Sequence, residues 1–237
     1  VKADYFTQPD PHFWDGAYFA VMAKPNWLHF QKVTGYVPAE HKILFQTLNE
    51  GLYDPKVHPE AAKFAMFNAL GVLDQPGEYW FDEAAEPDGT HKVLLWPLKT
   101  GADGPEGVTA SVRKTGFLVT GAHDVTIEGF KIEKQSGDGA AGVEASKCTR
   151  LVVKNNEVTL LCSGMKRGGA ISMRDIDAGS IENNKIALNR RLSGIMVSRF
   201  NNSVTIGNTL FKNGSTAVDY YDCHHSKILK NIVTEHN

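Results

Sequence analysis

The sequence predicts an all-β protein: a right-handed parallel β-helix that follows an irregular, β-rich N-terminal region. Three observations predict this fold. The second half of the chain repeats every 23 to 28 residues, each repeat has an apolar residue at a fixed place, and each repeated segment ends in Asn or Gly. We place the N-terminal region at residues 1–120 and the β-helix coils at residues 121–237.

Five segments of the second half can be superimposed. They are residues 125–129, 151–155, 179–183, 204–208 and 227–231, with offsets of 151 − 125 = 26, 179 − 151 = 28, 204 − 179 = 25 and 227 − 204 = 23. Alternate residues of a strand point to opposite faces, so we expect the apolar third residues to point inward: Ile127, Val153, Ile181, Ile206 and Leu229. Parallel strands are joined by right-handed crossovers as a rule, which favours the right-handed form.

The last residue of each segment predicts a corner of the coil. These residues are Gly129, Asn155, Asn183, Asn208 and Asn231. Gly and Asn tolerate the left-handed backbone of a sharp turn. Stacked Asn side chains can also hydrogen-bond from one coil to the next.

A second short strand precedes each of the later segments, and each begins after a small residue. Its inward residues are Val143, Ile171, Ile195 and Val218. Five places further on stand Cys148, Ile176, Phe200 and Cys223, a mostly apolar set that predicts core packing for two of the three cysteines. Leucine-rich repeats have a similar period, but they need regularly spaced leucines and a helical segment, and neither is present.

Residues 1–120 do not repeat, and they contain all four tryptophans. The alternating stretches 17–22 and 92–96 predict strands. Residues 60–70 favour a helix by composition, although Gly71 would equally suit a loop there. We expect Trp14, Trp27, Trp80 and Trp96 to pack between the N-terminal strands and the β-helix rather than to stack on a ligand.

Composition excludes several classes of protein. With 42% hydrophobic and 22% charged residues the chain should bury a core, and its net charge of −2 argues against nucleic acid or an anionic membrane surface as partner. No apolar run reaches the roughly 18 residues of a membrane span. Three cysteines without metal-ligand spacing predict neither a disulfide framework nor a metal site. No signal peptide opens the sequence, which does not settle the compartment.

Two segments carry a resemblance. Residues 73–82 (Leu-Asp-Gln-Pro-Gly-Glu-Tyr-Trp-Phe-Asp) and 93–97 (Val-Leu-Leu-Trp-Pro) resemble a phrase near the start of bacterial right-handed parallel β-helix (pectate-lyase-like) carbohydrate-active proteins. There the two segments form a hairpin on the β-helix. The resemblance implies a polysaccharide-active protein, similar to β-helix glycoside hydrolases, that is secreted, periplasmic or on the cell surface. Such proteins are usually longer, so we expect further coils or a partner chain at the C-terminal end.

Outward residues of the second strand are the candidate catalytic groups. Coils stack about 4.8 Å apart, so equivalent residues form ladders. Asp219 is the first candidate because it is outward on a rigid strand, and Asp222 and Asp175 follow. The last two are two coils apart, roughly 10 Å, just beyond the roughly 6.5–9.5 Å of inverting glycosidases. Arg199 between them would keep both ionised, and a purely structural ladder of ion pairs is the interpretation that we favour for this column.

The candidate substrate-binding residues surround these carboxylates. They are Arg174, Arg199, Glu144, Tyr221, His224 and Asp138. Asp138 lies in a Gly-Asp-Gly turn, where a carboxylate could bind a sugar hydroxyl or a cation. Arg167 and Arg190-Arg191 occupy equivalent loops and could recognise an acidic sugar.

Three functions remain open. The first is a glycoside hydrolase that uses Asp219 and Asp222 and needs no cofactor or metal. The second is a lyase for uronate-containing glycans, in which Arg174, Arg199 or Lys147 neutralises the sugar carboxylate and Ca²⁺ is a candidate cofactor. The third is a non-catalytic carbohydrate-binding or cell-surface module.

Overall fold

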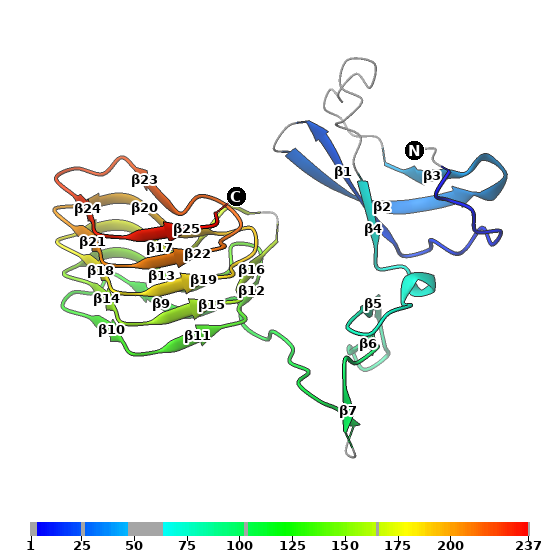
Figure 1. The fold of residues 1–237 in the computed structure, drawn as a ribbon, viewed down its shortest axis with the longest axis horizontal. Helices are drawn as coiled ribbons and strands as arrows, with labels where there is room; N and C mark the ends of the chain where they lie inside the picture. The colour runs from blue at the N-terminus through cyan, green and yellow to red at the C-terminus, as the bar shows by residue number, and fades with distance from the viewer. Residues whose placement is uncertain (1–3, 25–26, 47–63, 102–103, 165, 237) are drawn as a thin grey trace. The chain divides into compact units, whose positions relative to one another are not determined.

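The computed structural model describes residues 4–24, 27–46, 64–101, 104–164 and 166–236. The side chains of residues 22–29, Trp27 among them, and residues 60–63 of the predicted helix lie outside the described set. The chain divides into two compact units, Val1–Val108 and Thr109–Asn237, which are described separately (Figure 1).

The first unit contains a four-stranded antiparallel sheet in the order β3-β2-β1-β4. Its strands are β1 (Tyr18–Lys24), β2 (Trp27–Val37), β3 (Lys42–Phe45) and β4 (Phe64–Phe67), with the 3-10 helix η1 (Pro38–Glu40) before β3. The strand predicted at 17–22 is confirmed. The helix predicted over 60–70 is wrong where the structure describes it, because residues 64–67 pair with β1 as a strand and this pairing outweighs local propensity.

Aromatic side chains build the core of this sheet. Phe19 is fully buried and stacks on Phe45, with ring centroids 5.0 Å apart. Trp14 is also buried, and it meets Phe6 edge to face at 5.7 Å. Trp14 therefore packs within the first unit's own core, as a large aromatic ring usually does.

The two segments form an antiparallel hairpin as predicted, and its packing on the β-helix stays a prediction. Its strands β5 (Tyr79–Ala85) and β6 (His91–Leu95) pair antiparallel, after the 3-10 helix η3 (Leu70–Val72) and before the short pair β7 (Thr100–Gly101) and β8 (Gly104–Pro105). Glu83 accepts hydrogen bonds from the Tyr18 hydroxyl and from Lys32 Nζ, which ties the hairpin to the sheet of the same unit. Trp80 is half-buried and Trp96 is exposed.

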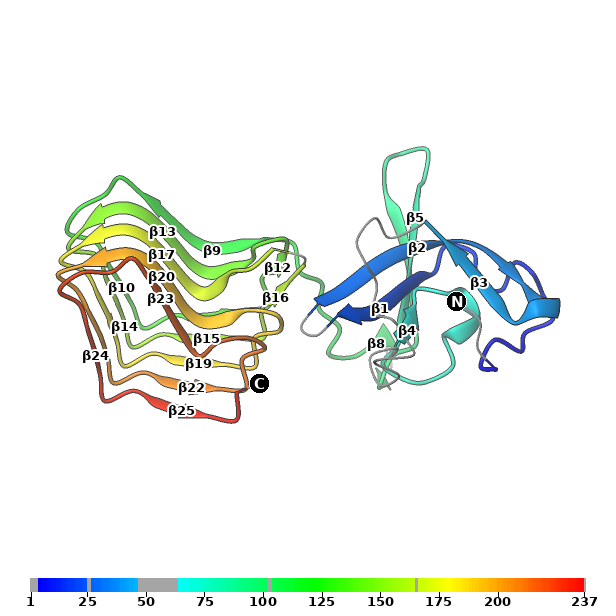
Figure 2. The ribbon, with the colours of Figure 1, turned by 90° about the horizontal axis from the view of Figure 1, so that it is seen from above.

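The second unit is a stack of parallel coils, which confirms the predicted all-β parallel β-helix (Figures 1 and 2). Each coil gives one strand to each of three sheets. The first sheet holds β9 (Thr115–Thr120), β13 (Ala141–Thr149), β17 (Gly169–Asp177), β20 (Ser193–Asn201) and β23 (Val218–Tyr221). The second holds β10 (Thr126–Glu128), β14 (Val152–Lys154), β18 (Ser180–Glu182), β21 (Val204–Ile206) and β24 (Lys227–Leu229). The third holds β11 (Lys131–Glu133), β15 (Glu157–Thr159), β19 (Lys185–Ala187), β22 (Thr209–Phe211) and β25 (Ile232–Thr234), beside the short pair β12 (Ser136–Gly137) and β16 (Cys162–Ser163).

The first coil begins earlier than the sequence division at residue 120. Strand β9 pairs in parallel with β13, with Phe117 opposite Val143, and the compact unit starts at Thr109. Gly116 fills the small position before the inward residue, as Gly142 does in the next coil. The sequence division missed this strand because the column of small residues was begun at Gly142 and did not include Gly116.

The register of the second sheet corrects two inward residues. Ile127, Val153 and Ile181 lie opposite one another as predicted, but the next two in register are Thr205 and Ile228 rather than Ile206 and Leu229. The fourth coil is therefore 205 − 181 = 24 residues after the third. A polar residue was not expected in the core, but the Thr205 hydroxyl hydrogen-bonds the Tyr220 hydroxyl at 2.5 Å.

The predicted Asn column is two adjacent columns. The corner itself is formed by residues with φ between 51° and 77°: Gly129, Asn155, Asn183, Gly207 and Lys230. The following residues of the later coils point inward as an Asn ladder, in which Asn156, Asn184 and Asn208 are buried and Asn231 of the last coil is half-buried. Asn184 Oδ1 accepts from the backbone N–H of Asn156 at 3.0 Å and from its Nδ2 at 3.1 Å. The prediction mixed the two columns because both contain Asn.

The small residues of the first sheet have a steric cause. A Cβ atom at Gly142 would lie 2.4 Å from Val158 Cγ1, and one at Gly194 would lie 2.5 Å from Leu210 Cδ2. Aliphatic side chains of the third sheet fill this space, so Gly142 and Gly194 leave no room for a Cβ atom, whereas the equivalent positions of the other coils hold Ala170 and Ala217. The predicted register of Val143, Ile171, Ile195 and Val218 is confirmed. Cys148 is a buried free thiol opposite Ile176, as predicted.

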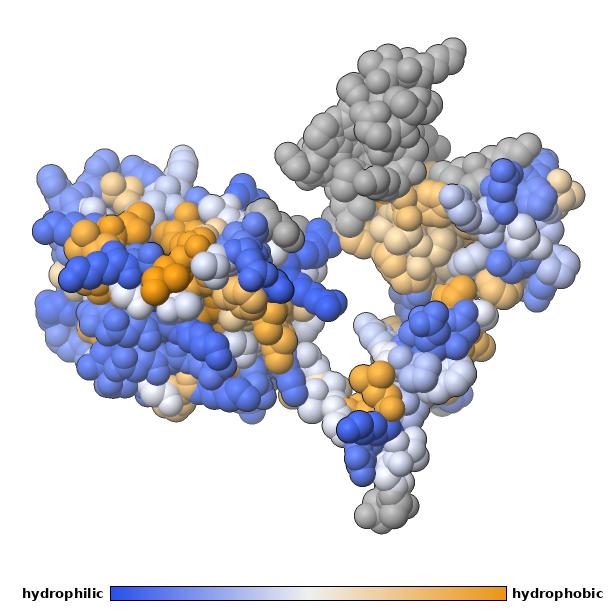
Figure 3. All heavy atoms as spheres, in the orientation of Figure 1, coloured by the Kyte–Doolittle hydropathy of each residue, from blue (hydrophilic) through white to orange (hydrophobic). Residues whose placement is uncertain are grey.

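The last coil leaves apolar side chains at the surface. Ile228 and Val233 are 52% and 47% exposed, whereas Ile181 and Ile186, in the same columns of the third coil, are fully buried. Hydrophobic surface marks this coil in Figure 3. Further coils or a partner chain at this end stay a prediction.

Candidate functional site

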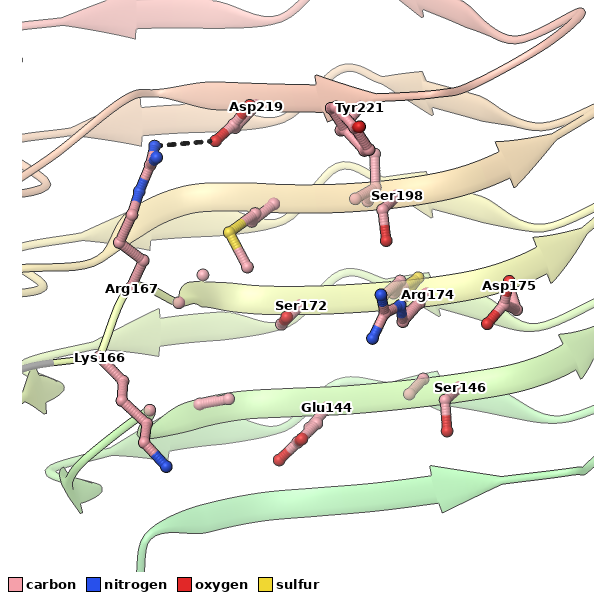
Figure 4. Close-up of a pocket in the computed structure, with 18 of the residues that line it drawn as sticks. Glu144, Ser146, Lys166, Arg167, Ser172, Arg174, Asp175, Ser198, Asp219 and Tyr221 are labelled. Atoms are coloured by element: carbon pink, nitrogen blue, oxygen red, sulfur yellow. Dashed lines mark hydrogen bonds and ion pairs between the residues drawn. The ribbon is translucent and has the colours of Figure 1, made fainter.

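A groove of about 890 Å³ runs over the outer face of the first sheet (Figure 4). Every coil contributes to its lining. Its floor is made by two outward columns, Glu144, Ser172, Met196 and Asp219 in one and Ser146, Arg174, Ser198 and Tyr221 in the other. These side chains face out because their strand neighbours, such as Val143 and Ala145, are buried in the core.

Two rims close the groove along its length. The loops that enter the first sheet contribute Lys114, Lys166 and Arg167. The corner at the other end of the strands contributes Lys147, Asp175 and Arg199, all in left-handed backbone conformation. The rims are therefore mostly cationic.

Asp175 is held by Arg199. The guanidinium donates from Nη2 to Oδ2 at 3.0 Å and from Nε to Oδ1. These hydrogen bonds lower the pKa of Asp175, and the positive charges of Arg199, Arg174 and Lys147 act in the same direction. Asp175 is thus an ionised, paired carboxylate, which suits a structural ion pair and excludes the role of a protonated acid.

Asp219 also has a cationic partner. Arg167 Nη2 lies 3.4 Å from Asp219 Oδ2, and Figure 4 shows the arginine reaching from its loop to the strand of the last coil. The Arg167 side chain is 79% exposed, so the pair is worth less than about 1 kcal/mol. Asp219 therefore faces the groove with a weakly held carboxylate.

The groove has more cations than anions. Its lining contains the six cations Lys114, Lys147, Lys166, Arg167, Arg174 and Arg199 against the three carboxylates Glu144, Asp175 and Asp219. The whole chain, in contrast, has a net charge of −2. Within the described residues, the side chains of Lys114, Lys147, Lys166 and Arg174 form no hydrogen bond or ion pair. A local excess of unpaired cations therefore faces the groove.

The structure brings together six of the predicted site residues. The groove is lined by Asp219, Asp175, Arg174, Arg199, Glu144 and Tyr221. Asp222, His224 and Asp138 are not part of the lining. Asp222 Oδ1 lies 3.3 Å from His224 Nε2 at the corner after β23, and Asp138 lies in the turn before β13.

Sequence reasoning missed Lys114 and Lys166. Both belong to a basic pair at the loop that enters the first sheet: Arg113-Lys114, Lys166-Arg167 and Arg190-Arg191. The recurrence of this pair in three coils would have identified the rim. Among the described residues no three His, Cys, Asp or Glu side chains gather as a metal site. No helix in the described part of the chain is long and apolar enough to cross a membrane.

The fold and the groove define a class of protein, a parallel β-helix with a polar, cation-rich groove along one sheet. The chain belongs to the family described as the right-handed beta helix region, whose model matches residues 108–237. This match confirms the predicted fold, including its handedness, and it covers the second compact unit. Comparisons with curated proteins and with solved structures found no match.

Proposed function

We propose that this protein is carbohydrate-active and that its groove binds an acidic polysaccharide. The observation that carries the proposal is the set of four unpaired cations in the groove, Lys114, Lys147, Lys166 and Arg174. A polymer with carboxylates along its length would pair with such cations on successive coils. We further propose a secreted, periplasmic or cell-surface location, where such polymers are found.

Arg174 is the central carboxylate-binding residue in this proposal. It projects from β17 between Ser146 of the coil before and Ser198 of the coil after, to which its strand is paired in register. A guanidinium donates two parallel hydrogen bonds to one carboxylate, and the flanking hydroxyls can bind neighbouring sugar oxygens. The Tyr221 side chain, exposed at 71%, offers a ring on which a sugar can stack.

Between the two reactions predicted from the sequence, elimination suits this groove better than hydrolysis. In elimination a base removes the proton α to the uronate carboxylate, the electron pair forms a C=C bond, and the C–O bond to the leaving sugar breaks. A cation on the carboxylate acidifies that proton, and in this proposal Arg174 would supply that cation.

Hydrolysis is the second candidate, favoured by the outward carboxylate of Asp219. It needs two carboxylates about 5–5.5 Å or roughly 6.5–9.5 Å apart. Asp175 and Asp222 occupy one corner column two coils apart, roughly 10 Å, and Glu144 and Asp219 are three coils apart, roughly 14 Å. Neither spacing fits, and Asp175 is already paired with Arg199.

Binding and turnover should be measured with polygalacturonate and with a neutral β-glucan. We expect calorimetry to detect binding of the acidic polymer only, weakening as salt is raised. Arg174→Ala should weaken it about tenfold, roughly 1.4 kcal/mol. Arg150→Ala is the matched control, because Arg150 pairs with Asp124 away from the groove. Equal binding of the neutral glucan, or no effect of salt, would contradict the proposal.

The reaction is assigned in the same samples. Absorbance of the unsaturated product, followed with added Ca²⁺ and with a chelator, reports elimination. New reducing ends without that absorbance, lost in the double variant Asp219→Ala, Asp222→Ala, would assign hydrolysis instead. Binding without either product would assign a non-catalytic module.

A further inference from the structure

The charges of the groove are unevenly distributed along its length. At the end formed by β9, β13 and β17, four cations have no hydrogen-bonded or ion-paired partner among the described residues: Lys114, Lys147, Lys166 and Arg174. At the end formed by β20 and β23, Arg199 is paired with Asp175 and Asp219 with Arg167. The first end thus has four unpaired cations against one carboxylate, Glu144, whereas the charged lining residues described at the second end are paired.

We propose that Asp219 is a specificity-determining residue that makes the β23 end of the groove select an uncharged sugar unit. This inference rests on the proposed function. The ligand would be an acidic polysaccharide that also contains neutral or esterified units, with its carboxylates beside Arg174 and the lysines of the rims and an uncharged unit over β23.

The first argument is electrostatic. Asp219 stands in the same outward column as Met196, one coil further along, so its carboxylate faces any ligand that reaches the last coil. A ligand carboxylate there would meet a like charge about one coil spacing away, and it would have to compete with Asp219 for Arg167. Asp219 thus already occupies the position of an acidic group at this end.

The second argument is the chemistry of the neighbouring side chains. Asp219 Oδ2 is used by Arg167, whereas Oδ1 has no hydrogen bond among the described residues and can accept one from a sugar hydroxyl. Met196 and Tyr221 flank it with an apolar chain and an aromatic ring. Acceptor, ring and apolar surface suit an uncharged sugar, which has hydroxyl donors and apolar C–H faces.

The test compares two polymers of the same backbone, fully de-esterified polygalacturonate and partially methyl-esterified pectin. The quantity measured is the ratio of their dissociation constants, fully acidic over partially esterified. Asp219→Asn removes the negative charge and keeps the shape, so we expect this ratio to fall about fivefold or more, through tighter binding of the fully acidic polymer. Asp177→Asn is the control, since Asp177 is an equally charged residue of the same sheet that does not line the groove, and it should leave the ratio unchanged.

The outcomes separate the inference from the proposed function. If the wild-type protein binds an acidic polymer but Asp219→Asn leaves the ratio unchanged, or weakens both polymers equally, the role given to Asp219 is wrong and the acidic-glycan groove stands. If the wild-type protein binds neither polymer, both are wrong. Circular dichroism of each variant confirms that the β-helix is intact.

Discussion

The two compact units build their cores in different ways. The first unit relies on aromatic contacts that occur once, such as Phe19 stacked on Phe45 and Phe6 against Trp14. The β-helix relies on columns in which each side chain meets its equivalents in the coils on either side, as Ile181 does. A core substitution in the β-helix should therefore disturb only the neighbouring coils. In the first unit, the loss of a single aromatic ring can lower the stability of the whole unit.

The largest effect is expected in the aromatic core. Phe19→Ala should destabilise the first unit by about 3–5 kcal/mol, because it leaves a cavity between Phe45 and Phe64. Urea unfolding followed by tryptophan fluorescence measures this directly, since all four tryptophans lie within residues 1–108. Phe67→Ala, at a partly exposed ring of the same sheet, should cost much less. Equal losses of stability in the two variants would contradict the expectation that the buried ring contributes more than the partly exposed one.

The next effect is expected in the buried Asn ladder. Asn184→Ala removes bonds to Val153, Asn156 and Asn208 and leaves the Asn156 N–H unsatisfied, so the β-helix should lose about 3 kcal/mol. The loss should appear in the far-ultraviolet circular dichroism melt and leave the tryptophan transition in place. Asn155→Gly, at the adjacent exposed corner, should change stability little because its φ of 55° suits glycine. A large loss from the corner variant would contradict the two-column structure.

A smaller effect is expected at Gly194, one of the positions of the first sheet where only a small residue is found. Gly194→Ala should destabilise the β-helix by about 2 kcal/mol, because the new Cβ would lie 2.5 Å from Leu210 Cδ2. Shortening the neighbour with Leu210→Val in the same chain should restore part of the loss. Thermal melts of the single and double variants measure both, and a double variant less stable than the sum of the two singles would argue against this contact.

The smallest effect concerns the ion pair at the groove corner. Arg199 lowers the pKa of Asp175 in the folded state, so the pair stabilises the fold at pH values above the ordinary pKa of an aspartate, and this contribution disappears as pH falls through the lowered value. Asp175→Asn should therefore flatten the loss of stability between neutral and acid pH slightly. Urea midpoints across that range measure it. A steeper acid loss in the variant would reverse the sign assigned to the pair.

Repetition explains what the sequence could predict. The first-sheet register and the outward position of Asp219 and Arg174 followed from period alone. The predicted inward residues of the second sheet are wrong from the fourth coil onward. Ile206 is more apolar than Thr205, and the neighbouring sequence does not show that Thr205 hydrogen-bonds Tyr220. In the first unit, the strand at 64–67 depends on pairing with β1, which local composition does not contain.

The sequence predicted the outward position of those groove residues that lie on strands, but not all of those that lie in loops. The floor of the groove follows the alternation of the first sheet, so four of its eight side chains were named as site candidates: Glu144, Arg174, Asp219 and Tyr221. Lys114 and Lys166 were missed because they lie in loops of unequal length, where only the arginines Arg167, Arg190 and Arg191 were recognised as equivalent.

Coil length varies at one corner only. The turn between the second and third sheets always has the same length, at residues 129–130, 155–156, 183–184, 207–208 and 230–231. The segment between the third sheet and the next first-sheet strand varies, at residues 134–140, 160–168, 188–192 and 212–217. Lys166 and Arg167 lie in the longest of these segments. A change of length in this segment would reshape one rim of the groove, and so change what the groove can bind, while the Asn ladder keeps its register.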